Sequence, residues 1–428
     1  MKSGSDGFGI ARALRHRNYK LFFSGQSVSL MGTWITRIAT SWLVYRLTNS
    51  ALLLGLVGFC GQIPTTLLAP FAGVAVDRVN RHRMLVWTQV LSAAQSAALA
   101  ALAFTGTITV GWILFLQIVQ GIINAFDTPA RQAFVVEMIE DRADLPNAIA
   151  LNSTMVNGSR IIGPSIGGVI IAGFGEAWCF TIDAISYLAV IASLLAMRLR
   201  PKETRLVEAS LFDDLRDGYR YVSGFAPVRT VLLLLALVSS MGMPYTVLMP
   251  AMASTVFHGG PHTLGFLMTA SGAGAVVGAL YLASRRSVLG LGRVMVMATL
   301  AFGVALVVFG ASRALWLALL VLPFAGAGFM VEMASTNTIL QTITEERLRG
   351  RVMAFYTLAF LGTAPIGSLL AGVVADRIGA PATIVGGGFV CVAGGVWLAL
   401  KLPSIRQLVR PIYVERGILP SLPSAESD

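Results

Sequence analysis

Long apolar runs, separated by short polar segments, constrain this chain more than any other feature of its sequence. They fall at residues 20–45, 52–76, 84–105, 109–136, 146–174, 177–197, 229–256, 263–284, 293–311, 314–341, 351–375 and 380–401. Each run is long enough for an α-helix that crosses a bilayer, which takes about 20 residues. The sequence therefore predicts an all-α polytopic membrane protein with twelve transmembrane helices in two six-helix bundles.

The composition agrees with this class. Of the 428 residues, 55% are hydrophobic and only 12% are charged, whereas a soluble domain carries roughly 25% charged residues. Cys60, Cys179 and Cys391 all lie in apolar runs, so we expect no disulfide framework. Residues 1–18 are polar and basic and contain no apolar signal-peptide core, so we expect no cleaved signal.

The basic residues predict the orientation. An even number of spans places both termini on the same side of the membrane. If that side is the cytoplasm, only Arg46, Arg313 and Arg377 lie outside, and nearly all other Lys and Arg residues lie inside. This asymmetry follows the positive-inside rule. We therefore expect a cell (inner) membrane protein with cytoplasmic termini, and the net charge of +11 needs no nucleic-acid partner.

Four regions follow from this pattern. Residues 1–198 and 228–402 each hold six spans, and residues 199–227 form a cytoplasmic linker. Within the linker, apolar residues at helical spacing predict an amphipathic interfacial helix; they are Leu211, Leu215, Tyr219 and Val222. We expect the proline-containing tail, residues 403–428, to be mostly disordered.

A short basic connection follows the second run, with the sequence GVAVDRVNRHR at residues 73–83. Asn80, at its turn, is of a type that tolerates a left-handed backbone. A simple basic turn would explain Arg78 and Arg81 but needs neither Gly73 nor Asp77. The stretch resembles the loop signature of the major facilitator superfamily, G-x-x-x-D-R-x-G-R-R.

This resemblance implies the superfamily's two six-helix bundles, transport by alternating access, and a cytoplasmic latch. In such a latch, Asp77 would meet the start of the eleventh span near Gly350, where a helix dipole favours an anion. Arg81 would pair with an acid at the end of the fourth span, for which Glu137 is the candidate. A second copy of the signature ends at Gly379. By topology it lies outside, so we interpret it as a helix end with a glycine terminator.

Ionisable residues inside a bilayer are costly and are candidates for function. The six within the spans are Arg37, Asp127, Arg131, Arg160, Asp183 and Glu332. Polar residues of the fourth span, including Gln117, Gln120, Asn124, Asp127 and Arg131, recur at helical spacing, as do Gln26, Ser29, Thr33, Arg37 and Ser41 in the first. We expect these two faces to border a substrate cavity, with Met243 in the seventh span as an adaptable apolar contact.

Two acids are candidates for proton coupling. Asp127 has Arg131 at i+4, so it is either a structural ion pair or part of the coupling machinery. Glu332 has no basic residue nearby in sequence, and a lone carboxyl in apolar surroundings is costly to ionise. Glu332 is therefore either a proton carrier or an acid paired across spans. Asp183, near the outer end of its span, is interpreted as a hydrogen-bond anchor.

A glycine-rich string in the fifth span comprises Arg160, Gly163, Pro164, Gly167 and Gly168. It resembles the antiporter motif of drug–proton exchangers and, together with residues 124–131 and 180–184, the enterobactin-exporter and macrolide-efflux branch of the superfamily. The resemblance implies that the string seals a leak path. The alternative is ordinary packing of small residues between helices.

We therefore expect a proton-coupled exporter of an amphipathic, siderophore-like or drug-like small molecule, acting as a monomer without a cofactor. An importer or facilitator of a polar metabolite on the same fold is the alternative. A membrane enzyme or receptor is less favoured, because the four histidines are scattered. Direct use of ATP is not expected, since no lysine fits a phosphate-binding loop. Glycines and a proline between His258 and His262 argue against a metal site.

Overall fold

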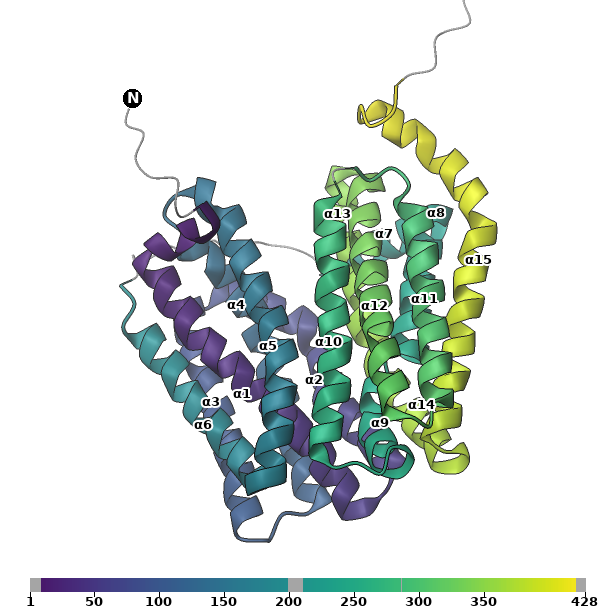
Figure 1. The fold of residues 1–428 in the computed structure, drawn as a ribbon. Coiled ribbons are helices and arrows are strands. Elements are labelled where there is room, and N and C mark those ends of the chain that lie inside the picture. Colours follow the sequence, from purple (N-terminus) through teal and green to yellow (C-terminus); the bar gives the residue numbers. More distant parts are fainter. Residues whose placement is uncertain (1–8, 199–210, 286, 421–428) are drawn as a thin grey trace, which may run out of the picture. The chain divides into compact units, whose positions relative to one another are not determined.

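The computed structural model describes residues 9–198, 211–285 and 287–420, and the described residues form helices and connecting turns without strands (Figure 1). The α-helices are α1 (Arg17–Thr48), α2 (Ala51–Arg78), α3 (Arg81–Phe104), α4 (Val110–Glu137), α5 (Leu145–Phe174), α6 (Glu176–Leu195), α7 (Leu211–Gly224), α8 (Ala226–Leu237), α9 (Tyr245–Ala251), α10 (Pro261–Ser284), α11 (Leu291–Ala311), α12 (Leu315–Ile343), α13 (Arg349–Thr357), α14 (Thr363–Ile378) and α15 (Ala380–Glu415). The predicted all-α class is confirmed.

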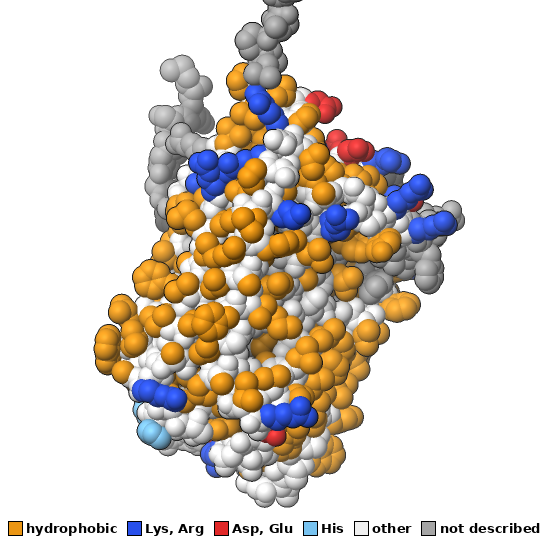
Figure 2. All heavy atoms as spheres, turned by 90° about the vertical axis from the view of Figure 1, so that its right-hand side faces the viewer, with side chains coloured by type: hydrophobic (Ala, Val, Ile, Leu, Met, Phe, Trp, Pro, Cys, Tyr) orange, Lys and Arg blue, Asp and Glu red, His pale blue; other side chains and the backbone are white. Residues whose placement is uncertain are grey.

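Among the described residues, 11 helical segments are long and apolar enough to cross a membrane. One of them, Ala226–Val256, joins α8 and α9 through π-helical turns, and another, Glu346–Ile378, joins α13 and α14 in the same way. α1 has 32 residues and occupies the place of the first predicted span. It is less apolar because it carries basic residues and a polar face. Figure 2 shows one face of the molecule, where hydrophobic side chains cover the middle and Lys and Arg gather mostly towards one end.

The chain divides into two compact units. The first contains Met1–Glu208, Thr246–Gly272 and Ser368–Ala380, and the second contains Ala209–Tyr245, Ala273–Gly367 and Pro381–Asp428. In the first unit, α1 packs against α5 and α6, α3 packs against α4 and α6, and α2 packs against α4. In the second unit, α11 and α12 form the most extensive helix pair.

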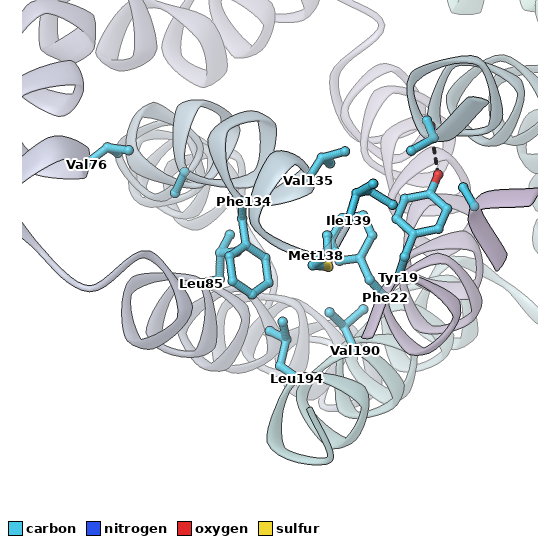
Figure 3. Close-up of a cluster of buried hydrophobic side chains, with 13 residues drawn as sticks. Tyr19, Phe22, Val76, Leu85, Phe134, Val135, Met138, Ile139, Val190 and Leu194 are labelled. Atoms are coloured by element: carbon cyan, nitrogen blue, oxygen red, sulfur yellow. Dashed lines mark hydrogen bonds between the residues drawn. The ribbon is translucent and has the colours of Figure 1, made fainter. Parts of the chain in front are cut away.

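A buried apolar cluster joins all six helices of the first half at the end where α1 begins (Figure 3). Its members include Tyr19 and Phe22 of α1, Leu85 of α3 and Phe134 of α4. Tyr19 is fully buried, and its hydroxyl donates to the carbonyl of Ala148 on α5 at 2.8 Å. The phenol thus fills the core and also satisfies its own polar atom.

Side chains at the helix ends explain where several helices start and stop. Ser50 caps α2 by accepting from the amide of Leu53, and Thr109 caps α4 by accepting from that of Trp112. α14 ends before Gly379, whose φ of 86° only glycine adopts easily, so the predicted glycine terminator is confirmed. The Asp376 carboxylate of this turn accepts from the Ser50 hydroxyl at 3.2 Å.

The prediction for the linker is confirmed in part, and the prediction for the tail is wrong in part. The predicted amphipathic helix is present as α7, while residues 199–210 lie outside the described part of the chain. The expectation of disorder from Pro403 onward is wrong up to Glu415, because α15 continues through Pro403 and Pro411. Its extension packs its own apolar side on the bundle, and Val409 is only 5% exposed. Tertiary burial therefore outweighs the cost of the two prolines.

Candidate functional site

The loop between α2 and α3 is held to α4 by an ion pair. The Arg81 Nη1 atom lies 2.6 Å from the Glu137 Oε1 atom, and both side chains are mostly buried. The predicted Arg81–Glu137 contact is confirmed. Asn80 does not adopt a left-handed backbone, as its φ is −62°; instead it caps α3 by accepting from the amide of Arg83 at 3.0 Å. The same short polar side chain serves a helix cap here instead of a turn.

The neighbouring residue His82 adds a second connection. Its Nε2 atom lies 2.8 Å from the carbonyl oxygen of Leu194 on α6, and its ring lies beside that of Phe134. Leu194 and Phe134 belong to the apolar cluster of Figure 3. The loop is therefore anchored to α4 and α6 at once.

The other residues of the predicted latch have fewer contacts in the described structure. The side chain of Asp77 lies outside the described part of the structure, so its predicted contact near Gly350 stays a prediction. Arg78 is exposed at the end of α2. A Cβ atom added at Gly73 would meet nothing within 4 Å, so local packing in this structure does not require glycine there.

Reversing the charges of the Arg81–Glu137 pair should test the latch. Arg81→Glu or Glu137→Arg alone places like charges together, and each should lower transport and the melting temperature. The double variant restores an ion pair and should recover most of both, with a coupling energy of about 1 kcal/mol. Thermal unfolding and vesicle transport of all four proteins measure this. Additive losses in the double variant would contradict the pairing.

The polar residues of α4 form a strip along one side of the helix and contact neighbouring helices. Gln120 donates from Nε2 to Ser92 of α3 at 3.2 Å and to Asn124 at 3.1 Å. Gln117 lies against Gly61 of α2, where any larger residue would meet its side-chain oxygen. Gln117, Gln120 and Asn124 are all partly buried. The strip thus contacts α2 and α3, and part of its polarity is used between helices.

Asp127 is the best-satisfied acid of the spans. Its Oδ1 atom accepts from the Thr88 hydroxyl at 2.8 Å and from Gln89 Nε2 at 2.7 Å. Its Oδ2 atom lies 3.8 Å from Arg131 Nε. Thr88 and Gln89 begin a polar face of α3 that the sequence analysis did not single out. Polar residues at helical spacing in the third apolar run, residues 84–105, are the sequence signal that indicates this face.

Asp183 joins α6 to α3. Ser96 Oγ donates to its Oδ2 atom at 2.8 Å, and the side chain is almost fully buried beside Gly32 of α1. A side chain at Gly32 would collide with the Asp183 carboxylate. This geometry suits a hydrogen-bond anchor between helices.

Glu332 lies inside the second unit. It is 0% exposed, and its Oε1 atom accepts from Thr336 Oγ1, one turn further along α12, at 3.1 Å. Its Oε2 atom has no hydrogen-bond partner among the described residues. Tyr356 of α13 and Cys391 of α15 are close enough to the Glu332 carboxyl to interact with its charge. Glu332 is thus enclosed within its own unit.

The glycine-rich string of α5 lies between two other helices of the first unit. Gly163 and Gly167 face α1 at Trp34 and Ile38, while Gly168 faces α10 at Pro261. α5 continues through Pro164 without a break. On its far side, Ser165 and Thr269 share a hydroxyl hydrogen bond of 2.6 Å, and Thr269 donates to the carbonyl of Ile161 at 3.0 Å. α10 thereby supplies a donor near the carbonyls that the proline leaves without partners.

Two arginines of the first unit stand beside this contact. Arg37 of α1 places its guanidinium over the ring of Trp34, 5.1 Å from the ring centroid. Arg160 precedes Gly163 by one turn and lies close enough to repel Arg37. Arg37 is exposed and Arg160 is partly buried.

The methionines of the seventh span differ in how far their side chains are exposed. Met249 and Met252, which follow Met243 in the same span, are both 0% exposed and belong to the core. Met241 is 40% exposed, and Met243 is partly buried at the end of a π-helical turn. The described residues contain no cluster of His, Cys, Asp and Glu that could hold a metal ion.

Comparison with known proteins places this geometry in context. A family model described as transmembrane secretion effector matches residues 10–411. The staphyloferrin A transporter of Staphylococcus aureus is 30% identical over 366 residues, which are 84% of this chain and 90% of that protein. The multidrug efflux pump Tap of Mycolicibacterium fortuitum is 28% identical over 387 residues, with coverages of 88% and 93%.

A third curated relative and a solved structure extend the comparison. Macrolide efflux protein A of Streptococcus pyogenes is 24% identical over 380 residues, with coverages of 85% and 92%. The crystal structure of a peptide transporter, POT, superposes with a TM-score of 0.72 at 13% identity, covering 92% of this chain and 95% of that one. At this identity, the structural likeness concerns the fold alone.

Proposed function

The chain belongs to the transmembrane secretion effector family of major facilitator transporters, and from this premise we propose that it is a proton-coupled exporter of an amphipathic small molecule. It works by alternating access, as a monomer in the cell membrane with both termini in the cytoplasm. Its task is transport rather than catalysis. The substrate is siderophore-like or drug-like, in keeping with what the names of its relatives state.

The observation that carries proton coupling is the environment of Glu332. A carrier must be neutral in one state and charged in another. A fully buried carboxyl that has one oxygen without a hydrogen-bond partner among the described residues is stable when protonated and costly when ionised. Asp127 is less suited, because Arg131, Thr88 and Gln89 all stabilise its charged form.

Polar groups lie between Glu332 and the end of α12. The Tyr356 hydroxyl donates to the carbonyl oxygen of Met333, the residue after Glu332, at 3.4 Å. Further along α12, the Asn337 side chain accepts from the side-chain amide of Gln341 at 2.7 Å, and Gln341 is exposed. These groups mark the side of α12 along which we propose that a proton reaches the buried carboxyl.

Transport in inverted membrane vesicles tests the proposal. The vesicles are prepared with and without the protein, a pH gradient is imposed, and a panel of siderophores and of cationic and neutral drugs is offered. An exporter should concentrate at least one compound inside the vesicles, and a protonophore should abolish the accumulation. Accumulation in right-side-out vesicles instead would favour the alternative, an importer of a polar metabolite.

A further inference from the structure

The first unit contains two arginines within its spans whose charge is not balanced. Arg131 has the Asp127 carboxylate 3.8 Å away. Among the described residues, neither Arg37 nor Arg160 forms an ion pair or a hydrogen bond through its side chain. The Arg37 guanidinium lies over the Trp34 ring and is repelled by Arg160.

The acids that could neutralise them are already engaged. Asp127 accepts from Thr88 and Gln89 and faces Arg131. Asp183 accepts from Ser96 on α3. Glu176 forms a two-point ion pair with Arg46 at the far end of α1, with distances of 2.9 and 3.0 Å. Each of these three acids would therefore have to give up one of its present contacts in order to pair with Arg37 or Arg160.

Arg37 and Arg160 lie on the parts of α1 and α5 that pack together. Arg37 lies over Trp34, and the backbone of Gly163, one turn after Arg160, packs against the Cβ atom of the same tryptophan. α1 and α5 are in direct contact along this stretch. An exposed guanidinium within a membrane span faces water or protein rather than lipid, because lipid cannot solvate it. The pair therefore borders a polar space.

We propose that Arg37 and Arg160 bind an anionic substrate that carries two carboxylates, and that Trp34 positions Arg37 for this contact. Guanidinium groups bind carboxylates with paired hydrogen bonds of fixed geometry. Stacking on the indole restricts the Arg37 side chain and leaves its N–H edge for the ligand. The inference specifies the substrate class of the proposed exporter and rests on that function.

Binding of a small dicarboxylate to the purified full-length protein tests the site. The probes are phthalate and phthalamide, which share a ring and a shape but differ in charge. In nanodiscs, titration calorimetry should show phthalate binding at least roughly tenfold more tightly than phthalamide. Arg37→Gln and Arg160→Gln should each weaken phthalate binding by roughly tenfold or more. Arg313→Gln, which removes an exposed arginine outside the spans, is the matched control and should bind normally.

Stability without ligand provides the second measurement. Two close cations without an acid repel each other, so Arg37→Gln and Arg160→Gln should raise the melting temperature of the ligand-free protein. Arginines with a purely structural role would give the opposite sign. The proposal is overturned if phthalate and phthalamide bind equally, or if both variants bind phthalate like the wild type.

The vesicle assay separates this proposal from the exporter function. If gradient-driven accumulation of a panel compound occurs but phthalate does not bind, the anion site is wrong and export stands. If phthalate binds in an arginine-dependent way but no compound is driven by the gradient, the site stands and proton-coupled export is wrong.

Discussion

Glu332→Gln should abolish pH-gradient-driven accumulation in inverted vesicles while it preserves exchange of substrate across the same membrane. Glutamine has nearly the shape of a protonated glutamate but cannot release a proton. Glu332 is fully buried and accepts one hydrogen bond, from Thr336, which the glutamine oxygen can still accept. The variant should therefore fold and reorient but remain permanently in the neutral form. We expect driven accumulation to fall by at least roughly tenfold, as for other lost proton-transfer groups.

The comparison variants make this test specific. Glu346→Gln removes an exposed acid in the turn before α13 and should transport like the wild type. Asp183→Asn alters a buried acid that accepts from Ser96. If Asp183 is an anchor, this variant should lose thermal stability but keep coupling. Driven accumulation that survives in Glu332→Gln and disappears in Asp183→Asn would assign the proton to α6 instead.

Gly167→Leu should stop transport although the protein still inserts into the membrane. A Cβ atom at Gly167 would already lie only 2.5 Å from Cγ2 of Ile38 and 3.3 Å from Cα of Ile35 on α1, which is closer than van der Waals contact allows. The larger leucine must therefore push α5 and α1 apart. Overpacking of this kind typically costs 1–3 kcal/mol. Separation of the helices would also open the path that the glycines are proposed to seal, so proton leakage should increase.

Another position in the same helix provides the matched control. A Cβ atom at Gly173, six residues further along α5, meets nothing within 4 Å. Gly173→Leu should therefore leave transport and the proton permeability of the vesicles near wild-type values. A pH-sensitive dye inside the vesicles measures the leak of each variant. Equal leak and equal transport for the two leucine variants would contradict the seal.

The Arg81–Glu137 contact of the proposed latch could be predicted from sequence, because the two residues carry opposite charges and a short connection restricts the position of Arg81. The α2–α3 connection is only a few residues long, so Arg81 is held near the end of α4, where Glu137 is the acid within reach. The role of Asn80 was misjudged for a local reason. The same side chain can support a left-handed turn or a helix cap, and the position of the next helix decides between them.

The spans and the class of the protein follow from the sequence alone, because a bilayer demands about 20 apolar residues per helix. The sequence does not determine which face of each helix is buried. Helical spacing groups Arg37 with other polar residues of α1. Only packing shows that Arg160 of α5 lies nearby and that neither arginine forms an ion pair with an acid in the part of the chain that the structure describes. Likewise, Glu332 looks unpaired in sequence, yet its enclosure by neighbouring helices is a property of the folded bundle. The physical reason is that charges in membranes are balanced across helices, between residues far apart in the chain, and hydropathy records only what each helix carries by itself.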